Sequence, residues 1–277
     1  MTTWQEQGPG GQGSGQYNLT LTRGDRQPLA LEIWDPALDS PVQNLTASAA
    51  RGSEGPVAAV PSRPGVYLFP GLRSLGRLPP GEQAEIRVQL RDSYRRFAPA
   101  SLALTVWYEE NGALQMRDRH GGQQLSPRPA QLYSDPNRSP GAILAVVRGD
   151  LWDQQANQPA AYGLVQVQIG DQTWTSAADG RGAFLVALPL PPRLPSLDSD
   201  GAQGPPTVAA TVAVLYQPGS VSLDPGGLPE LTDLAAQAPG VIYPAAGSTP
   251  VSQISVQLPY TAELVVRSEN SSWFLIG

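Results

Sequence analysis

Residues Val147 to Leu188 read VRGDLWDQQANQPAAYGLVQVQIGDQTWTSAADGRGAFLVAL and decide how the chain folds. Short apolar runs alternate in this stretch with Pro, Gly-Asp and Asp-Gly, which are turn signals. Strands of about five or six residues between such turns are typical of antiparallel β-sandwiches. Asp and Trp are dense here, but neither His nor Cys accompanies them. The stretch therefore predicts the framework of a sandwich and not an active site.

The same pattern continues on both sides and predicts a β-sandwich domain at 142–277. Two inserts rich in Pro, Gly and Asp, 189–206 and 217–251, have no periodicity, so we expect surface loops or arms that bind partners. Within the second insert, residues 229–237 could form one or two helical turns. Strands are expected at 143–152, 164–169, 173–175, 183–186, 208–216, 254–258 and 264–267.

Another β-sandwich domain is expected at 16–108, after a flexible tail at 1–15 that has almost nothing to bury. Residues 109–141 are polar and are expected to be a linker, long enough to pack along a domain or a partner. The apolar anchors of this linker are Leu114, Met116, Leu132 and Tyr133. Strands of the first domain are expected where apolar and polar residues alternate, at 17–22, 29–34, 65–70, 86–90 and 102–107.

A weak internal repeat relates the two halves. LALEIWDPALDSPVQNLTASA at 29–49 runs parallel to AVVRGDLWDQQANQPAAYGLVQV at 145–167. Each has an apolar strand, Trp-Asp, a polar turn with Pro and a further apolar run. PGVYLFPGL at 64–72 is likewise similar to GRGAFLVALP at 180–189. Two copies of one sandwich type explain both similarities.

Composition agrees with this reading of the fold. Gly and Pro contribute 29 residues each, which favours turns over long helices. Hydrophobic residues make up 40% of the 277 residues, enough for ordinary cores. The predicted fold is all-β, with two small antiparallel β-sandwich domains that carry long loops rich in Pro and Gly.

The charge balance excludes some classes of protein. The chain has 24 acidic residues against 18 basic residues, and all the basic ones are Arg. An acidic chain without a basic run is a poor nucleic-acid binder. Arg is enriched at protein interfaces, although genome composition could produce the same bias. The absence of Cys excludes disulfides and thiolate metal sites.

The sequence contains no recognisable targeting signal. The first residues, MTTWQEQGPGGQGSGQ, have neither the charged n-region nor the apolar h-region of a signal peptide. No apolar run approaches the roughly 20 residues needed to span a bilayer. We therefore expect a soluble chain that stays in the cytoplasm or is assembled there.

No constellation of residues predicts catalysis, a cofactor or a metal. A zinc peptidase site and a Ser-His-Asp triad both need His, and the one His, His120, is interpreted as a surface-loop residue. The G-x-G-x-x-G at 8–13 lies in the tail and is interpreted as chance. The Arg-Gly-Asp tripeptides at 23–25 and 148–150 are assigned to turns and strands, and the Asp-rich 198–201 to a turn. A carboxylate pair for glycoside hydrolysis stays open, because only its spacing in the fold identifies it.

Aromatic and apolar residues at the two chain ends are the candidate interface residues. Four other Trp residues lie on or at the ends of expected strands, where core packing is the commonest role. The chain ends differ because they have no fold of their own. The C-terminal segment is too apolar for a free tail, so we expect it to dock on its own domain or on a neighbour. The interface candidates are Trp4, Trp273, Phe274, Leu275 and Ile276.

Residues 143–216 resemble the carboxypeptidase regulatory-like domains. The resemblance implies a transthyretin-like, or prealbumin-like, β-sandwich. It says almost nothing about activity, because one fold hosts many functions. The matching elements are Gln158-Pro159, Leu164 to Ile169, Thr173 to Thr175, Asp179 to Gly182 and Phe184 to Leu188.

Several segments between residues 17 and 277 carry a second resemblance, among them GVYLFPGLRSL, RDSYRRFAPASLALTV, GAILAVVRGDLWD and AELVVRSENSSWFLIG. Through these segments the chain resembles proteins encoded among the components of phage tail-like contractile injection systems. This resemblance implies a non-enzymatic structural or accessory component of the baseplate region or the cap. Such a component would join sheath, tube, baseplate or cap proteins through its loops and termini.

Two alternatives stay open. The chain could be a stand-alone carbohydrate-binding or adhesive β-sandwich module, for which glycan binding through exposed Trp or Tyr would be the sign. It could also be an accessory domain of an enzyme whose catalytic subunit is elsewhere.

Overall fold

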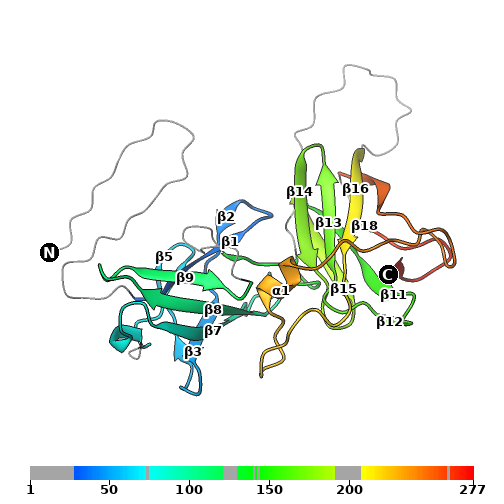
Figure 1. Cartoon of the computed structure of the whole chain (residues 1–277). Helices are drawn as coiled ribbons and strands as arrows, with labels where there is room; N and C mark the ends of the chain where they lie inside the picture. The colour runs from blue at the N-terminus through cyan, green and yellow to red at the C-terminus, as the bar shows by residue number, and fades with distance from the viewer. Residues whose placement is uncertain are drawn as a thin grey trace, which may run out of the picture.

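Two β-sandwiches lie side by side, with the short helix α1 (Leu231–Ala235) between them (Figure 1). The fold is all-β, as the sequence predicts. The expected strand at 17–22, the G-x-G-x-x-G, the first Arg-Gly-Asp and the 198–201 turn lie outside the described residues. The computed structural model describes residues 28–72, 75–120, 130–139, 141, 144–190, 207–260 and 263–277.

The first sandwich is built from two sheets that enclose one apolar core. Its elements are β1 (Ala30–Asp35), β2 (Ser40–Pro41), β3 (Thr46–Arg51), β4 (Val57–Ala58), β5 (Val60–Arg63), β6 (Val66–Leu68), η1 (Leu75–Arg77), β7 (Gln83–Arg91), β8 (Ala100–Tyr108), β9 (Leu114–Asp118) and β10 (Ala130–Gln131). One sheet has the order β10-β1-β6-β5, with β2 paired to β1, and the other has the order β4-β3-β7-β8-β9. Alternate residues such as Ile33, Val88 and Leu104 are buried between the sheets.

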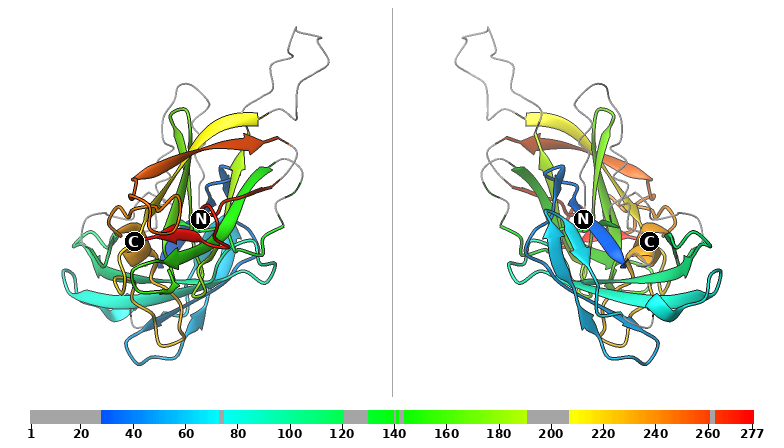
Figure 2. Two further views of the ribbon diagram at one scale, coloured as in Figure 1. Left: turned by 90° about the vertical axis from the view of Figure 1, so that its right-hand side faces the viewer. Right: turned by 90° about the vertical axis from the view of Figure 1, so that its left-hand side faces the viewer.

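The second sandwich repeats this plan. Its strands are β11 (Leu144–Asp153), β12 (Gln158–Pro159), β13 (Leu164–Ile169), β14 (Gln172–Ala177), β15 (Ala183–Pro189), β16 (Thr207–Leu215), β17 (Gln253–Pro259), β18 (Leu264–Val265) and β19 (Phe274–Ile276). One sheet centres on β11, which pairs with β12, β15, β18 and β19, and the other has the order β14-β13-β16-β17. β19 runs parallel to β11, and the two lie together when the second sandwich faces the viewer (Figure 2, left).

The weak repeat in the sequence corresponds to one strand-and-turn unit that occurs twice with the same register. In each copy, a Trp lies opposite a Pro, and the Asp after that Trp lies opposite the residue before the Pro. The pairs are Trp34–Pro41 and Asp35–Ser40 in the first copy, and Trp152–Pro159 and Asp153–Gln158 in the second. We call the unit the Trp-Asp turn. Four strands of one sheet also have matching orders, β4-β3-β7-β8 in the first sandwich and β14-β13-β16-β17 in the second, and only the first adds a further strand, β9. The two sandwiches therefore share this part of their topology.

The expected linker at 109–141 contains strands of the first sandwich. Its residues Leu114–Asp118 form β9, which pairs with β8, and Ala130–Gln131 form β10, which pairs in parallel with β1. The prediction of a plain linker is therefore wrong for these residues. The predicted anchors Leu114, Met116 and Leu132 are buried in the first core. Leu114 and Met116 alternate with polar residues along β9, which is typical of a half-buried strand.

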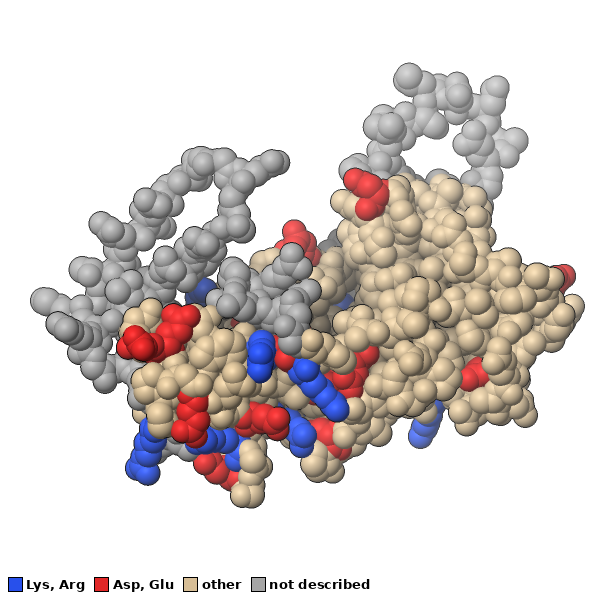
Figure 3. Space-filling model, in the orientation of Figure 1, with Lys and Arg blue, Asp and Glu red and all other residues tan. Residues whose placement is uncertain are grey.

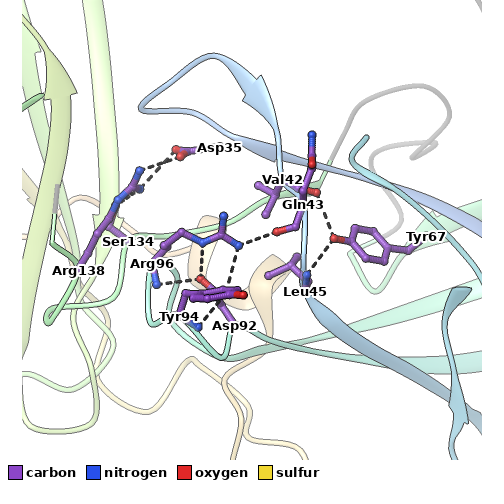
Figure 4. A network of polar contacts seen from close by, with 10 residues as sticks. All are labelled: Asp35, Val42, Gln43, Leu45, Tyr67, Asp92, Tyr94, Arg96, Ser134 and Arg138. Carbon is purple, nitrogen blue, oxygen red and sulfur yellow. Dashed lines mark hydrogen bonds and ion pairs between the residues drawn. The ribbon is translucent and has the colours of Figure 1, made fainter. Parts of the chain in front are cut away.

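A polar network holds the loops of the first sandwich (Figure 4). The Arg96 guanidinium donates to both carboxylate oxygens of Asp92, at 2.9 and 3.2 Å. Burial would raise the pKa of Asp92, but hydrogen bonds from Arg96 and Tyr94 and the charge of Arg96 outweigh it and lower that pKa. The Tyr67 hydroxyl donates to one backbone carbonyl and accepts from one backbone N–H of the β2–β3 connection, at 3.1 and 3.0 Å.

Candidate functional site

The insert at 217–251 joins the two sandwiches. β9 pairs with β8 only from Leu104 onward, so the earlier part of β8 needs another partner. The insert supplies it: the Ser101 N–H donates to the Pro229 carbonyl at 2.8 Å, and the Ala103 N–H donates to the Glu230 carboxylate at 2.9 Å. The expectation of a surface loop or a partner-binding arm is therefore wrong for this part of the insert, which binds the first sandwich of the same chain. The predicted helical turn is confirmed as α1.

Apolar side chains also pack across this contact between the insert and the first sandwich, which we call the joint. Leu231 and Leu234 of α1 are buried in the core of the first sandwich, together with Leu164 and Ala177 of the second. The Gln237 side-chain amide, just after α1, donates to the Tyr162 carbonyl at 2.8 Å. The joint thus combines sheet hydrogen bonds with a shared apolar core, and the two sandwiches are packed into one body.

Two buried carboxylates in the joint have pKa values shifted in opposite directions. Burial raises the pKa of Glu230, and hydrogen bonds from Ala103 and Ser101 oppose that effect without cancelling it. Burial would also raise the pKa of Asp233. There, hydrogen bonds from Ser222 and His120 and the charge of Arg119 outweigh it, so the pKa is lowered.

The one His belongs to this joint. Its Nε2 lies 2.9 Å from the Asp233 carboxylate, and its side chain is 47% exposed. The interpretation of His120 as a surface residue is confirmed, but its contact joins the turn after β9 to α1. Among the described residues, no group of three or more His, Cys, Asp or Glu side chains could hold a metal ion.

The C-terminal interface candidates separate into two kinds. Phe274, Leu275 and Ile276 form β19 and are buried against β11. The expected docking is therefore onto the chain's own domain, and these three residues do not form a surface for a neighbour. Trp273 is 43% exposed and stacks on Trp152, with ring centroids 4.7 Å apart. Trp4 lies outside the described residues.

The second Arg-Gly-Asp is part of a paired strand. It lies within β11, where the Arg148 guanidinium donates to Glu263 at 2.8 Å. A Cβ added to Gly149 would lie 2.5 Å from the Val266 carbonyl oxygen, so this position needs the close backbone approach that Gly allows. The tripeptide has the strand role that the sequence analysis assigned to it and is not presented at a loop tip.

A groove of about 630 Å³ opens where the outer surfaces of the two sandwiches meet. The first sandwich contributes Trp34, Gln131 and Tyr133, and the second contributes Gln166 and Thr175. Trp34 and Gln131 are neighbours in register across β1 and β10, and Gln166 and Thr175 across β13 and β14. Core packing was the favoured role for Trp34 in the sequence, but the buried residues of β1 are Leu31, Ile33 and Asp35.

One sheet of the second sandwich has an outer face without charged residues, which we call the neutral face. The inward residues Val165, Val167, Val212 and Val214 are in the core, so the alternate residues point outward. Near the first sandwich this face holds Leu164, Ala177 and Leu215, which pack against the core of the first sandwich, and its far end holds Pro259. The other outward positions are Gln, Thr, Ser and Ala: Gln166, Gln168, Thr173, Thr175, Thr207, Ala209, Thr211, Ala213, Gln253, Ser255 and Gln257. The alternation in VQVQI was the signal in the sequence, and it served there only to place a strand.

The neutral face ends at an open edge. β17 is the last strand of its sheet and, within the residues that the structure describes, pairs with β16 alone. Charged side chains gather on the first sandwich, whereas the second is largely uncharged on the side drawn in Figure 3.

Comparison with known proteins finds few similarities. No family model and no curated protein matches the chain. A solved C-terminal fragment of the pilus adhesin SpaC from Lactobacillus rhamnosus GG, from an iodide-soaked crystal, matches with a TM-score of 0.23 and 7% identity, over 90% of this chain and 96% of the fragment. The adhesin in its open conformation matches with the same TM-score and 9% identity, over 89% of this chain and 30% of the adhesin. TM-scores this low give no basis for inferring a shared function.

Membrane crossing by a helix is not indicated. The helices among the described residues are too short and too polar to span a bilayer.

Proposed function

We propose that the chain is a non-enzymatic structural component that joins other protein subunits in a particle of the phage tail-like contractile kind. The resemblance of its sequence to components of such systems names the particle. The observation that carries the proposal is the neutral face together with the open edge of β17. Both features favour contact with another protein.

A comparison of edge strands supports this role. Exposed edges are usually protected by charge, by Pro or by a bulge. β5, an edge of the first sandwich, has all three, since it contains Pro61 and Arg63 and its pairing shifts register between them. β17 has seven residues, no charged side chain and one Pro at its end, Pro259. An edge without such protection is suited to strand addition by a partner.

The joint explains how one chain can hold two contacts at a fixed separation. Because the insert hydrogen-bonds to β8 and α1 shares the first core, a partner held on the second sandwich would be positioned relative to the first. A subunit that joins others needs this property, and two sandwiches on a flexible linker would lack it.

Cross-linking in assembled particles tests the proposal. The chain has no Cys, so Ser255→Cys on the outward face of β17 gives a single reactive thiol for a short cross-linker. Ser62→Cys on the protected edge β5 is the matched control. We expect the β17 variant to cross-link to a particle subunit and the chain to co-sediment with sheath and tube proteins. A chain that never co-sediments, or that cross-links equally from both sites, would contradict the proposal.

A further inference from the structure

Trp34 and Trp152 occupy the same position in the two Trp-Asp turns but differ in what covers them. Trp152 is stacked by Trp273. No aromatic ring of the described residues stacks on Trp34, which is half-buried and borders the groove between the sandwiches. Its indole N–H donates to the Asp39 carboxylate at 3.1 Å. The ring edge is thus held in place while the residue lines an open groove.

The groove lining combines aromatic rings with neutral hydrogen-bonding groups. Trp34, Tyr133 and Trp174 supply the aromatic surface. Two amides and two hydroxyls come from Gln131, Gln166, Thr173 and Thr175. The volume of about 630 Å³ lies within the roughly 300–1,000 Å³ of small-molecule sites. Such a lining fits a ligand that has an apolar face and many hydroxyl groups.

We propose that this groove binds a neutral oligosaccharide, with one sugar ring against Trp34 and its hydroxyls hydrogen-bonded to Gln131 and Gln166. A pyranose ring has an apolar face of C–H groups and a rim of hydroxyls, which an indole and two amides complement. The site does not depend on the role in a particle proposed above.

The same lining disfavours other classes of ligand. The lining residues include no Arg, and their one carboxylate is Asp39, so an anionic glycan or a phosphate would find a negative charge and no cation. A wholly apolar ligand would bury the amides of Gln131 and Gln166 without partners, which is costly. A neutral polyhydroxylated ligand meets neither penalty.

Binding of the full chain to a defined glycan panel tests the proposal. The neutral probes are cellohexaose, maltohexaose and chitohexaose, and the anionic probe is a heparin-derived hexasaccharide, each measured by saturation-transfer NMR and calorimetry. We expect at least one neutral probe to bind and the anionic probe not to bind. Trp34→Ala should weaken that binding about tenfold or more, because aromatic anchors dominate recognition.

Two variants keep the result interpretable. Trp273→Ala, at the stacked Trp of the second turn, is the matched control and should leave glycan affinity unchanged. Gln166→Leu, on the opposite wall, keeps the side-chain bulk and should weaken binding about fivefold through one lost hydrogen bond, even if Trp34→Ala disturbs folding. Absence of binding to every neutral probe, binding of the anionic probe alone, or affinity unaffected by both groove variants would each overturn the proposal.

Discussion

The two Trp-Asp turns share one backbone arrangement, yet their buried aspartates have different partners, a cation in one turn and a neutral hydroxyl in the other. In both, the carboxylate accepts from the backbone N–H two residues later, at 2.9 Å. Asp35 then pairs with the Arg138 guanidinium at 2.8 Å, with both side chains buried (Figure 4). Asp153 instead accepts from the Tyr216 hydroxyl at 3.1 Å.

The difference shows that the same turn can hold different segments of the chain. Its first carboxylate oxygen caps the turn, and the second is free to hold a distant segment. In the first sandwich that segment is the chain after β10, and in the second it is the end of β16. A full positive charge compensates one carboxylate and a neutral phenol the other, so the two copies should respond differently to the loss of the partner.

The largest effect is expected from Arg138→Met. It leaves the Asp35 carboxylate buried without its cation, and breaking a buried pair on one side costs about 3–5 kcal/mol. The Arg138 guanidinium also donates to Ser134 and lies 5.1 Å from the Phe97 ring centroid, contacts that are lost too. Urea unfolding of the full chain should show this loss as a lower free energy of unfolding.

The double variant Asp35→Asn/Arg138→Met is the control for this prediction. Asn keeps an oxygen for the Ala37 N–H, so the turn is retained while the unpaired charge is removed. We expect the double variant to recover most of the lost stability. If it is no more stable than Arg138→Met alone, the cost lies in packing and not in the buried charge.

The next largest effect is expected at the glycine that faces each turn. The Gly65 and Gly182 carbonyls accept hydrogen bonds from the backbone N–H of the residue before each Trp, Ile33 and Leu151, at 2.8 Å in both copies. Both glycines have positive φ, 76° and 85°. A Cβ at Gly182 would lie 2.3 Å from the Leu151 carbonyl oxygen. Gly182→Ala should therefore cost about 2–3 kcal/mol, measured by thermal and urea unfolding.

Gly170→Ala is the matched control in the same sandwich. Gly170 also has positive φ, but a Cβ there would have nothing within 4 Å. Its substitution should cost about 1 kcal/mol, for backbone conformation alone. Equal costs at the two sites would show that the close approach between Gly182 and β11 does not matter.

A smaller effect is expected from Tyr216→Phe. It removes one hydrogen bond to a carboxylate that keeps two backbone N–H donors, Gln155 and Ala156. The cost should be about 1.5 kcal/mol, well below that of Arg138→Met. A loss as large as that of Arg138→Met would contradict the distinction between the two turns.

The same tyrosine predicts a pH dependence. Burial and the nearby Asp153 carboxylate raise the pKa of Tyr216 to about 12, from 10.0. The folded chain then holds the phenol proton more tightly than the unfolded chain, so this stability is complete below pH 10 and is lost as the pH rises toward 12. Tyr216→Phe should reduce the slope of unfolding free energy against pH in that window. Part of the slope should remain, because burial also raises the pKa of Tyr133 to about 12.

Much of the fold could be predicted from local pattern. β13 was predicted with its observed bounds, because apolar and polar residues alternate from Val165 to Ile169. β3 was missed because its buried positions are Ala47 and Ala49, whose small side chains leave a weak hydrophobic signal. β9 was missed because its two apolar residues lie in a polar segment.

The candidate sites could be predicted much less well. The groove and the joint depend on which distant segments meet, as where Glu230 completes the edge of β8. The hydrophobic periodicity of a single segment carries no information on which distant segments pair. The Gln and Thr residues of the neutral face are visible in the sequence at alternate positions of single strands. That they form one surface follows only from the order of the strands in the sheet.

The smallest effect is expected from Trp273→Ala, which tests the stack on the second turn. Trp273 is nearly half exposed, so its truncation loses the stacking on Trp152 and little core packing. The cost should be about 1 kcal/mol, the scale of an aromatic pair, and β19 should stay paired through Phe274 and Ile276. Hydrogen exchange of the β19 amides tests this, and we expect their protection to be unchanged. Loss of protection would mean that Trp273 anchors β19 and that the second Trp-Asp turn depends on the stacked Trp273 ring.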